Sequence, residues 1–441
     1  MDATRRKFLL SSLLGAGGIG LRALATGIPV SVLATLANPR TARADDAAPT
    51  CASPQYIFLC TSGGGDPLNA NVPGTYDNPN FYHSNRMEMA ATPITFGTGK
   101  TVSGAKVWST LAPDVLARMA VFHTATYTNS HGDLAKVNRL QGAVQRQEMT
   151  VSLFSKNIAS CLKTIQDQPM VLSNNLITFK GAAQPVLSPQ SLASVLASPS
   201  GALGDLQKIR DKNLDELNAL FKSSGTLSQR TILDQYALSQ TQARNLSQDL
   251  LSDLGSIRGG SRQDQNTAAA VLFKMNVSPV AVGNYSFGGD NHGDNGLNGE
   301  TQAHIDSIAG ITDFMAKLTK YGLRDQVTMS FQNVFGRTMK VEAHEGTIDG
   351  RNHNSNHHAS VFIGAPFKGG VYGAVKETAN GYDSQATGIN STTGAGDDGG
   401  DIKYEDTFAS VGKTFGIAVG VTQAIIDDQI TKGKVITAAL K

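Results

Sequence analysis

The sequence predicts an α/β fold in which a mainly parallel sheet has helices on both faces. Short, continuous apolar runs are typical of strands buried on both sides. They alternate with segments whose apolar residues recur at three- and four-residue steps, as in helices. The 441 residues are 40% hydrophobic and 17% charged, which excludes a disordered chain. A chain of this length forms one large domain or about two to three smaller ones.

The amino-terminal segment has the features of an export signal. Residues 4–10 read Thr-Arg-Arg-Lys-Phe-Leu-Leu and resemble the twin-arginine signature, and a Gly/Ala/Ser-rich apolar stretch follows to residue 37. Residues 42–44, Ala-Arg-Ala, have the small-x-small form of a cleavage site. We therefore expect residues 1–44 to be a twin-arginine signal peptide, with the export machinery as a partner and a periplasmic or secreted destination.

The alternative for this segment is an uncleaved anchor helix. Arg22 and Pro29 interrupt the apolar stretch, so we expect no stable membrane span in the mature chain. The first 44 residues carry six Lys/Arg and one acid, which leaves 32 basic and 35 acidic residues and a net charge of −3. The body has no basic stripe, so nucleic acid is excluded as an expected partner.

The chain elements follow in order after a linker at 45–55. Strands are expected at 56–60, 119–123, 169–172, 279–287, 326–334 and 359–363. Helices are expected at about 111–118, 131–165, 300–321 and 404–418. Residues 202–255 have strong helical spacing and few candidate catalytic groups, so we interpret them as a structural insertion or cap. Residues 376–400, rich in Gly, Asp and Thr, are expected to form a surface loop.

Three cysteines are too few for a disulfide scaffold. Cys51, Cys60 and Cys161 are compatible either with one disulfide and a free thiol or with three buried thiols.

Polar clusters lie next to several of the expected strands. Asp66 follows the first strand, Ser130-His131 opens the helix after the strand at 119–123, residues 290–295 read Asp-Asn-His-Gly-Asp-Asn, and Asn352-His353 precedes the strand at 359–363. Ligands of open α/β sheets bind beyond the carboxyl ends of the strands. Asp and His are ligands for zinc, manganese or iron. Taken singly, each cluster could also be a turn or a solvated loop.

These residues also carry a resemblance to a known family. The motifs are Ser-Gly-Gly-Gly-Asp-Pro-Leu-Asn at 62–69, Phe-Gly-Arg-Thr at 335–338, Gly-Arg-Asn-His at 350–353 and Lys-Gly-Gly-Val-Tyr-Gly at 368–373. Together with the export signal, they resemble the exported bacterial family Domain of Unknown Function 1501, which is distantly similar to the alkaline-phosphatase and sulfatase superfamily. The resemblance spans most of 56–420, and the region 170–265 matches poorly.

The resemblance implies a three-layer α/β/α sandwich over residues 56–441, similar to alkaline phosphatase, with the helical insertion at about 202–255. It implies a pocket of metal-binding residues, namely Asp66, His131, Asp290, His292 and His353. It further implies that Arg337 or Arg351 holds an anionic group, although a buried structural ion pair is an equal alternative for Arg337. Ser130, Thr128 and Ser62 are candidate nucleophiles by location, and a metal-bound water would make a side-chain nucleophile unnecessary.

Two positions depart from the family's usual pattern. Val334 and Asn352 stand where the family usually has acids. A two-metal site is therefore not expected, and we expect either one divalent ion (zinc, manganese or calcium) or none. The resulting hypotheses are a metal-dependent hydrolase of phosphate or sulfate esters and, alternatively, a non-catalytic periplasmic protein that keeps the fold and binds an anionic ester, a polymer or a partner.

Overall fold

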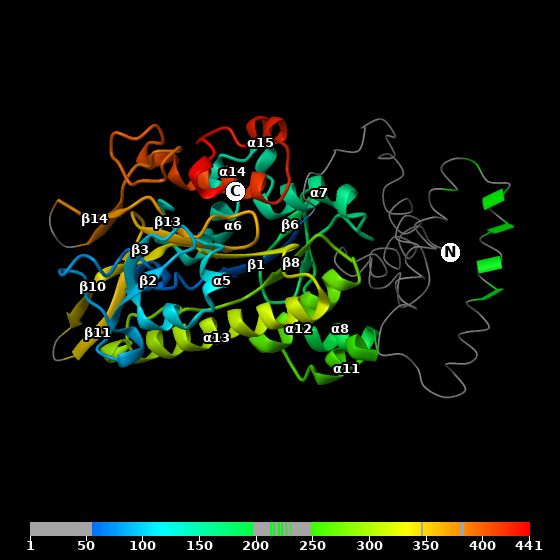
Figure 1. The fold of residues 1–441 in the computed structure, drawn as a ribbon, viewed down its shortest axis with the longest axis horizontal. Coiled ribbons are helices and arrows are strands. Elements are labelled where there is room, and N and C mark those ends of the chain that lie inside the picture. Colours follow the sequence, from blue (N-terminus) through cyan, green and yellow to red (C-terminus); the bar gives the residue numbers. More distant parts are fainter. Residues whose placement is uncertain are drawn as a thin grey trace, which may run out of the picture.

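A seven-stranded sheet forms the centre of the molecule (Figure 1). The structure, a computed structural model, describes residues 55–196, 248–344, 347–379 and 383–441, and isolated residues between 212 and 230. The strand order is β13-β4-β12-β9-β1-β8-β5. In chain order the strands are β1 (Tyr56–Ser62), β4 (Met119–Thr124), β5 (Met170–Val171), β8 (Val280–Gly283), β9 (Val327–Asn333), β12 (His358–Ile363) and β13 (Gly370–Tyr372). Only β12 runs antiparallel to its neighbours, so this mixed α/β fold has the mainly parallel sheet that the sequence predicts.

Strand β1 divides its side chains between two apolar cores. Tyr56, Phe58 and Cys60 belong to one core, and Ile57 and Leu59 belong to the other. Successive side chains of a strand point to opposite faces. The continuous apolar run of β1 is therefore explained by helices on both sides of the sheet.

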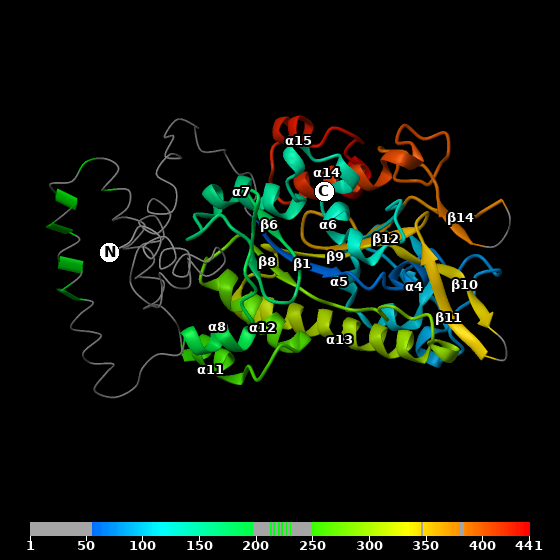
Figure 2. The ribbon, with the colours of Figure 1, turned by 180° about the vertical axis from the view of Figure 1, so that it is seen from behind.

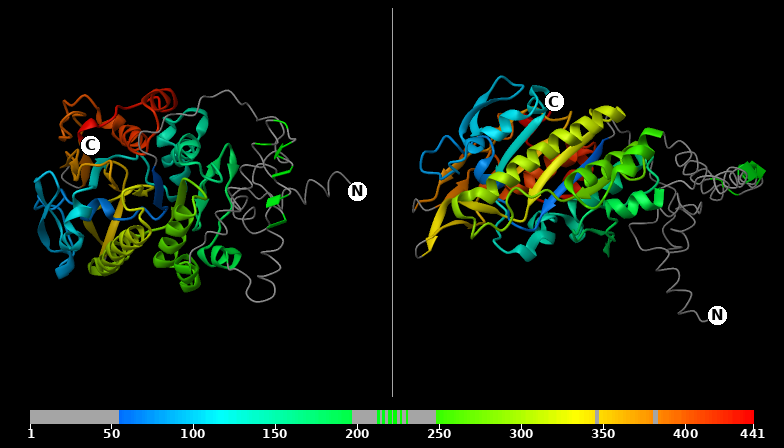
Figure 3. Two further views of the ribbon diagram at one scale, coloured as in Figure 1. Left: turned by 45° about the vertical axis from the view of Figure 1, so that its right-hand side comes forward. Right: turned by 90° about the horizontal axis from the view of Figure 1, so that it is seen from below.

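Each core is closed by its own helices (Figures 2 and 3). One face packs against α8 (Pro189–Leu196), α11 (Gln248–Ser256), α12 (Arg262–Lys274) and α13 (Asn298–Tyr321). The other face packs against α6 (Leu134–Val137), α7 (Thr150–Leu162), α14 (Thr407–Ala418) and α15 (Gln423–Gln429). Two four-residue helices, α4 (Leu68–Asn71) and α5 (Pro113–Leu116), complete the described α-helices.

Four two-stranded sheets surround the main one. They pair β2 (Ala91–Thr95) with β3 (Thr101–Ala105), β6 (Thr178–Phe179) with β7 (Ala182–Ala183), β10 (Gly336–His344) with β11 (Thr347–Asn354), and β14 (Val375–Glu377) with β15 (Ser384–Ala386). The β10–β11 hairpin extends from the end of the molecule that carries the β14–β15 pair (Figure 1). It places residues 351–354 beside the carboxyl edge of the main sheet.

Most predicted elements are present, with three corrections. The strand predicted at 279–287 ends at Gly283, because the following residues turn to hold Asp66. The helix predicted at 131–165 is broken into short turns before α7, and Leu140, Gln141, Arg146 and Gln147 have positive φ there. The loop predicted at 376–400 contains the short β14–β15 pair.

Several predictions concern residues outside the described part. The signal peptide at 1–44, residues 45–54 of the linker, and most of the insertion at 202–255 lie there. In the described part, Cys60 is free and buried, and Cys161 is disulfide-bonded. No helix among the described residues combines the length and apolarity needed to cross a membrane.

Candidate functional site

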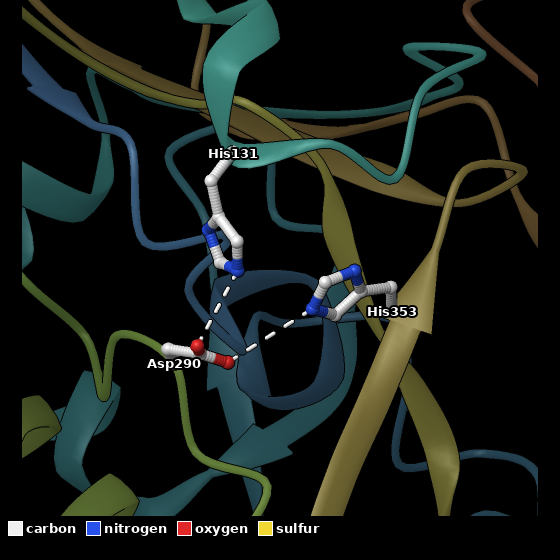
Figure 4. A group of neighbouring side chains, drawn as sticks. All are labelled: His131, Asp290 and His353. Carbon is white, nitrogen blue, oxygen red and sulfur yellow. Dashed lines mark ion pairs between the residues drawn. The ribbon is translucent and has the colours of Figure 1, made fainter.

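An aspartate and two histidines meet beyond the carboxyl edge of the sheet (Figure 4). Asp290 lies in the loop after β8, His131 begins the short helix that follows β4, and His353 belongs to β11. His131 Nε2 lies 3.3 Å from Asp290 Oδ2, and His353 Nε2 lies 3.9 Å from Asp290 Oδ1. The three ligand atoms lie within 4.8 Å of one another. The sequence predicted all three residues, and the fold brings them together.

Backbone carbonyls orient both imidazoles. His131 Nδ1 donates to Gly63 O at 2.8 Å, and His353 Nδ1 donates to Asn129 O at 2.6 Å. A carbonyl can only accept, so each Nδ1 carries a proton, and Nε2 has a lone pair when the ring is neutral. Burial, assisted by the charge of Arg337, lowers the pKa of His353 and favours its neutral form.

These lone pairs face a carboxylate, which also only accepts. His353 Nε2 is buried and has no hydrogen-bonding partner among the described residues. Acceptors that face one another are stabilised by a cation between them. Nε2 coordination with an anchored Nδ1–H is the arrangement of metal-ligating histidines. The donor set therefore fits a divalent metal ion.

The ring of Phe335 packs against both imidazoles. Its buried ring lies 5.0 Å from the ring of His131 and 4.3 Å from that of His353. The same ring packs so closely on Gly65 that a Cβ there would overlap it, and Gly65 has a φ of +60°. A glycine is therefore required at this turn.

Arg337 connects Asp290 to the glycine turn, which is formed by residues 63–65. Its fully buried guanidinium donates to Gly64 O at 2.7 Å, to Gly65 O, and to Asp290 Oδ1 at 2.7 Å. Desolvation of Asp290 opposes ionisation, but the hydrogen bond and charge of Arg337 outweigh it and lower the pKa of Asp290. Because these contacts use the guanidinium within the fold, the structure places Arg337 as the partner that fixes Asp290.

His292 lies beside this group but has a different partner. Its Nε2 lies 3.2 Å from Arg337 Nη1 and 3.2 Å from Asp290 Oδ1. An arginine nitrogen always donates, so Nε2 accepts. The ring of His292 is 46% exposed and lies 4.7 Å from that of His353.

Asp66 lies behind the cluster and has no exposed surface. It accepts from Ser62 Oγ at 3.0 Å and from the backbone N–H of Phe287 at 2.9 Å. The pKa of Asp66 is raised, because the effect of burial exceeds the opposing effect of these hydrogen bonds. The structure thus uses Asp66 to join the glycine turn to the loop that carries Asp290, and it is not part of the Asp–His group.

Arg351 is likewise enclosed. It is fully buried and donates through Nε to both oxygens of Glu300, at 3.2 and 2.9 Å. Its other nitrogens donate to the carbonyls of Thr338 and Tyr82. The guanidinium therefore anchors β11 to α13 and offers no free edge to an anion.

The segment at 290–295 performs several tasks. Asp290 joins the cluster, while Asn291 donates to Glu300 Oε2 at 2.8 Å. Asp294 accepts from the backbone N–H groups of Gly299 and Glu300 at the start of α13, as an acid at a helix amino terminus does. Asp294 thus has the turn-forming role, whereas Asp290 lies in the Asp–His cluster.

The candidate nucleophiles differ in their partners. Ser130 is exposed and precedes His131. The hydroxyl of Thr128 donates to Asp133 at 2.6 Å, and that of Ser62 donates to Asp66. Both of these hydroxyls are buried. Exposure therefore favours Ser130 over Thr128 and Ser62.

Val334 and Asn352 take no part in the cluster. Val334 is fully buried in the core that contains Leu59 and Phe335. The backbone N–H of Asn352 donates to Thr338 Oγ1, and its side-chain oxygen accepts from the N–H of His353. Asn352 thereby shapes the strand just before His353.

Sequence reasoning missed a chain of buried histidines below the site. Asn69 Nδ2 lies 3.2 Å from His357 Nδ1, and His357 Nε2 lies 2.9 Å from His123 Nδ1. His358 accepts the backbone N–H of Asn333 at 3.2 Å. Burial lowers the pKa of His123 to about 4 and of His358 to about 3. The pair His357-His358 is visible in the sequence, but its meeting with His123 depends on the β4–β12 pairing.

Comparison with known families gives a match for the second half of the chain. Residues 196–418, slightly more than half of the chain, match a family described as a protein of unknown function (DUF1501). This segment contains Asp290, His292, Arg337 and His353, and it excludes Asp66 and His131. A search of curated proteins found no match.

Proposed function

The chain belongs to the DUF1501 family, and from this premise we propose that it is an exported hydrolase of phosphate or sulfate esters with one divalent metal ion. The observation that carries the proposal is the pair of Nε2 lone pairs, on His131 and His353, that face Asp290. As part of the same proposal, the fold is a three-layer sandwich related to alkaline phosphatase. The mainly parallel sheet, the helices on both faces and the cluster at its carboxyl edge support this relationship.

The expected ion is held by His131, Asp290 and His353. Three protein ligands leave positions for a substrate, as catalytic metal sites do. Zinc or manganese suits this nitrogen and oxygen donor set better than calcium, which prefers oxygen ligands alone. When bound, such an ion acts as a Lewis acid toward an ester oxygen.

The side chains around the ion prepare the site. Arg337 keeps Asp290 ionised and fixed, and the carbonyls of Gly63 and Asn129 hold the two imidazoles in the coordinating tautomer. Ser130 supplies an exposed hydroxyl next to His131. These groups bind and orient, and they give the site one carboxylate charge to offset the ion.

A non-catalytic binding protein is the second candidate. Its supporting observation is that Arg337 and Arg351, the groups expected to hold the substrate's anion, are both enclosed by carbonyls and carboxylates. Such a protein would bind the metal, and an anionic polymer or partner through it, without turnover.

The test is metal analysis of the untagged, natively exported protein, followed by hydrolysis of p-nitrophenyl phosphate and p-nitrophenyl sulfate. We expect one equivalent of metal and turnover that is lost in His353→Ala. Metal without turnover on either ester selects the binding protein. Absence of stoichiometric metal, together with no hydrolysis, overturns the hydrolase proposal.

Export by the twin-arginine pathway is proposed on independent grounds. Arg5 and Arg6 supply the signature, and the disulfide at Cys161 is of a kind found in oxidising compartments. The double variant Arg5→Lys, Arg6→Lys should retain the protein in the cytoplasm. Cell fractionation checks this, and unchanged export of the variant would contradict the proposal.

A further inference from the structure

The three histidines next to Asp290 fall into two kinds according to the direction of their hydrogen bonds. His131 and His353 have Nδ1 tied to carbonyls and Nε2 directed at Asp290. In His292 the relation is reversed, because Nε2 accepts from Arg337. The nitrogen that the other two rings offer to a metal is thus already used in His292.

The closeness of His292 to Asp290 therefore needs no metal ion. Arg337 Nη1 faces His292 Nε2 at 3.2 Å, while Arg337 Nη2 donates to Asp290 Oδ1 at 2.7 Å. One guanidinium bridges both acceptors, and it supplies the cation that lets them lie 3.2 Å apart. Arg337 occupies the position that a second metal ion would need between these two residues.

The remaining nitrogen of His292 is a free donor. With Nε2 accepting, a neutral ring carries its proton on Nδ1. Among the described residues, Nδ1 has no hydrogen-bonding partner, and the ring is 46% exposed and tilted against that of His353 at 4.7 Å. It is therefore an N–H group at the rim of the cluster that the fold does not consume.

The Nδ1–H group of His292 matters because neither Arg337 nor Arg351 is free to bind an anion. Arg337 and Arg351 have no exposed side-chain surface, so they cannot turn toward a ligand without breaking the ion pairs that hold the loops. An anion bound at the cluster must then find its donors among the exposed groups, and His292 is one of them.

We propose that His292 is an anion-binding residue of this site and not a metal ligand: its Nδ1–H donates to an oxygen of a phosphate or sulfate group bound next to the ion. The inference rests on the proposed metal site. A hydrogen bond to a charged oxygen in this position contributes about 1.5–3 kcal/mol, which corresponds to roughly 10- to 150-fold in affinity.

The test separates metal binding from anion binding. Co²⁺ is titrated into the untagged protein and followed by visible absorption, and inorganic phosphate or sulfate is then titrated into the Co²⁺-loaded protein. We expect His292→Ala to bind Co²⁺ within about threefold of the wild type, whereas His131→Ala and His353→Ala lose about 100-fold or more. We expect His292→Ala to weaken phosphate or sulfate binding at least about tenfold, and His292→Gln, which keeps an N–H donor, to restore part of it.

Each outcome decides the matter. A Co²⁺ loss in His292→Ala as large as that in His353→Ala identifies His292 as a ligand and overturns the inference. Equal anion binding by the wild type and His292→Ala, or none by the wild type, also overturns it while leaving the metal site standing. If the wild type binds no Co²⁺, the proposed function fails and this inference fails with it.

Discussion

Arg337 and Asp290 form a 2.7 Å ion pair in which the guanidinium is fully buried and the carboxylate is 51% exposed. The arginine thus lies in the interior of the protein, whereas the carboxylate lies at its surface. The buried arginine thereby holds Asp290, the acid of the cluster, in a fixed position. The same guanidinium also holds the carbonyls of Gly64 and Gly65.

The first prediction is that Arg337→Lys strongly destabilises the protein. Lysine cannot reproduce the planar fork that contacts Asp290 and two carbonyls at once, so buried acceptors lose their partners. We expect a loss of about 3 kcal/mol in the free energy of unfolding, measured by urea denaturation. Arg86→Lys, in the exposed pair with Glu88, is the matched control and should change stability by less than about 1 kcal/mol. Equal effects of the two variants would contradict this role.

The buried pair of Arg351 and Glu300 supports a second prediction. Both side chains are fully buried, and Asn71 and Asn291 donate to Glu300 as well. Glu300→Gln removes the charge that offsets Arg351, which should cost about 3–5 kcal/mol in urea denaturation.

The matched control for that variant is Asp306→Asn. Asp306 is half-exposed and lies 3.9 Å from Arg262, so its loss should have an effect below about 1 kcal/mol. A Glu300→Gln protein as stable as the control would show that α13 and β11 do not depend on this ion pair.

Val334 gives a third prediction, which tests whether an acid at this position would add a second metal ion to the site. The side chain is fully buried in the core, so Val334→Glu would place a carboxylate among apolar groups without a partner. We expect a loss of several kcal/mol, measured by urea denaturation, and no gain of metal stoichiometry.

Val186→Glu serves as the matched control for Val334→Glu. Val186 is exposed, and its replacement should alter stability by about 0.5 kcal/mol or less. A stable Val334→Glu protein that binds a second metal ion would contradict this prediction.

The sequence predicts the sheet well because buried strands leave a direct mark. The run Tyr56-Ile57-Phe58-Leu59 has no polar residue, and such a run requires cover on both faces. The direction of β12 could not be predicted from the sequence, since a parallel and an antiparallel strand buried on both faces have the same composition. The β10–β11 hairpin was missed because its residues, such as Arg337 and Arg351, are polar for reasons of tertiary contact.

The same distinction applies to the site. Asp290 and His131 could be proposed because their residue types follow strands, and parallel strands bring such loops to one edge. His353 precedes its strand, and it reaches the same edge because β12 runs antiparallel to β4 and β9. The roles of Asp66, Arg337 and Arg351 could not be separated from the sequence. Their functions depend on which carbonyls and carboxylates surround them, and these come from segments more than 200 residues apart in several cases, as the contact of Arg337 with Gly65 shows.

The last prediction concerns stability against acid. His123, His357 and His358 are fully buried, and burial lowers the pKa of each, to about 4 for His123 and about 3 for His358. In the unfolded chain a histidine has a pKa of about 6.5. Above that pH neither state binds a proton at these residues, so they leave stability unchanged. As the pH falls from 6.5 toward 4, the unfolded state binds protons that the folded state rejects, and stability decreases.

His123 alone should remove about 3 kcal/mol by pH 4, at 1.36 kcal/mol for each pH unit. Urea denaturation at pH 7.5, 6.5, 5.5 and 4.5 measures the effect. His123→Gln keeps an acceptor for His357 and should flatten the decline. Stability that is constant or rises between pH 6.5 and 4.5 would show that these imidazoles take up protons within the folded protein, and that the buried chain His357–His123 is not held in its neutral form.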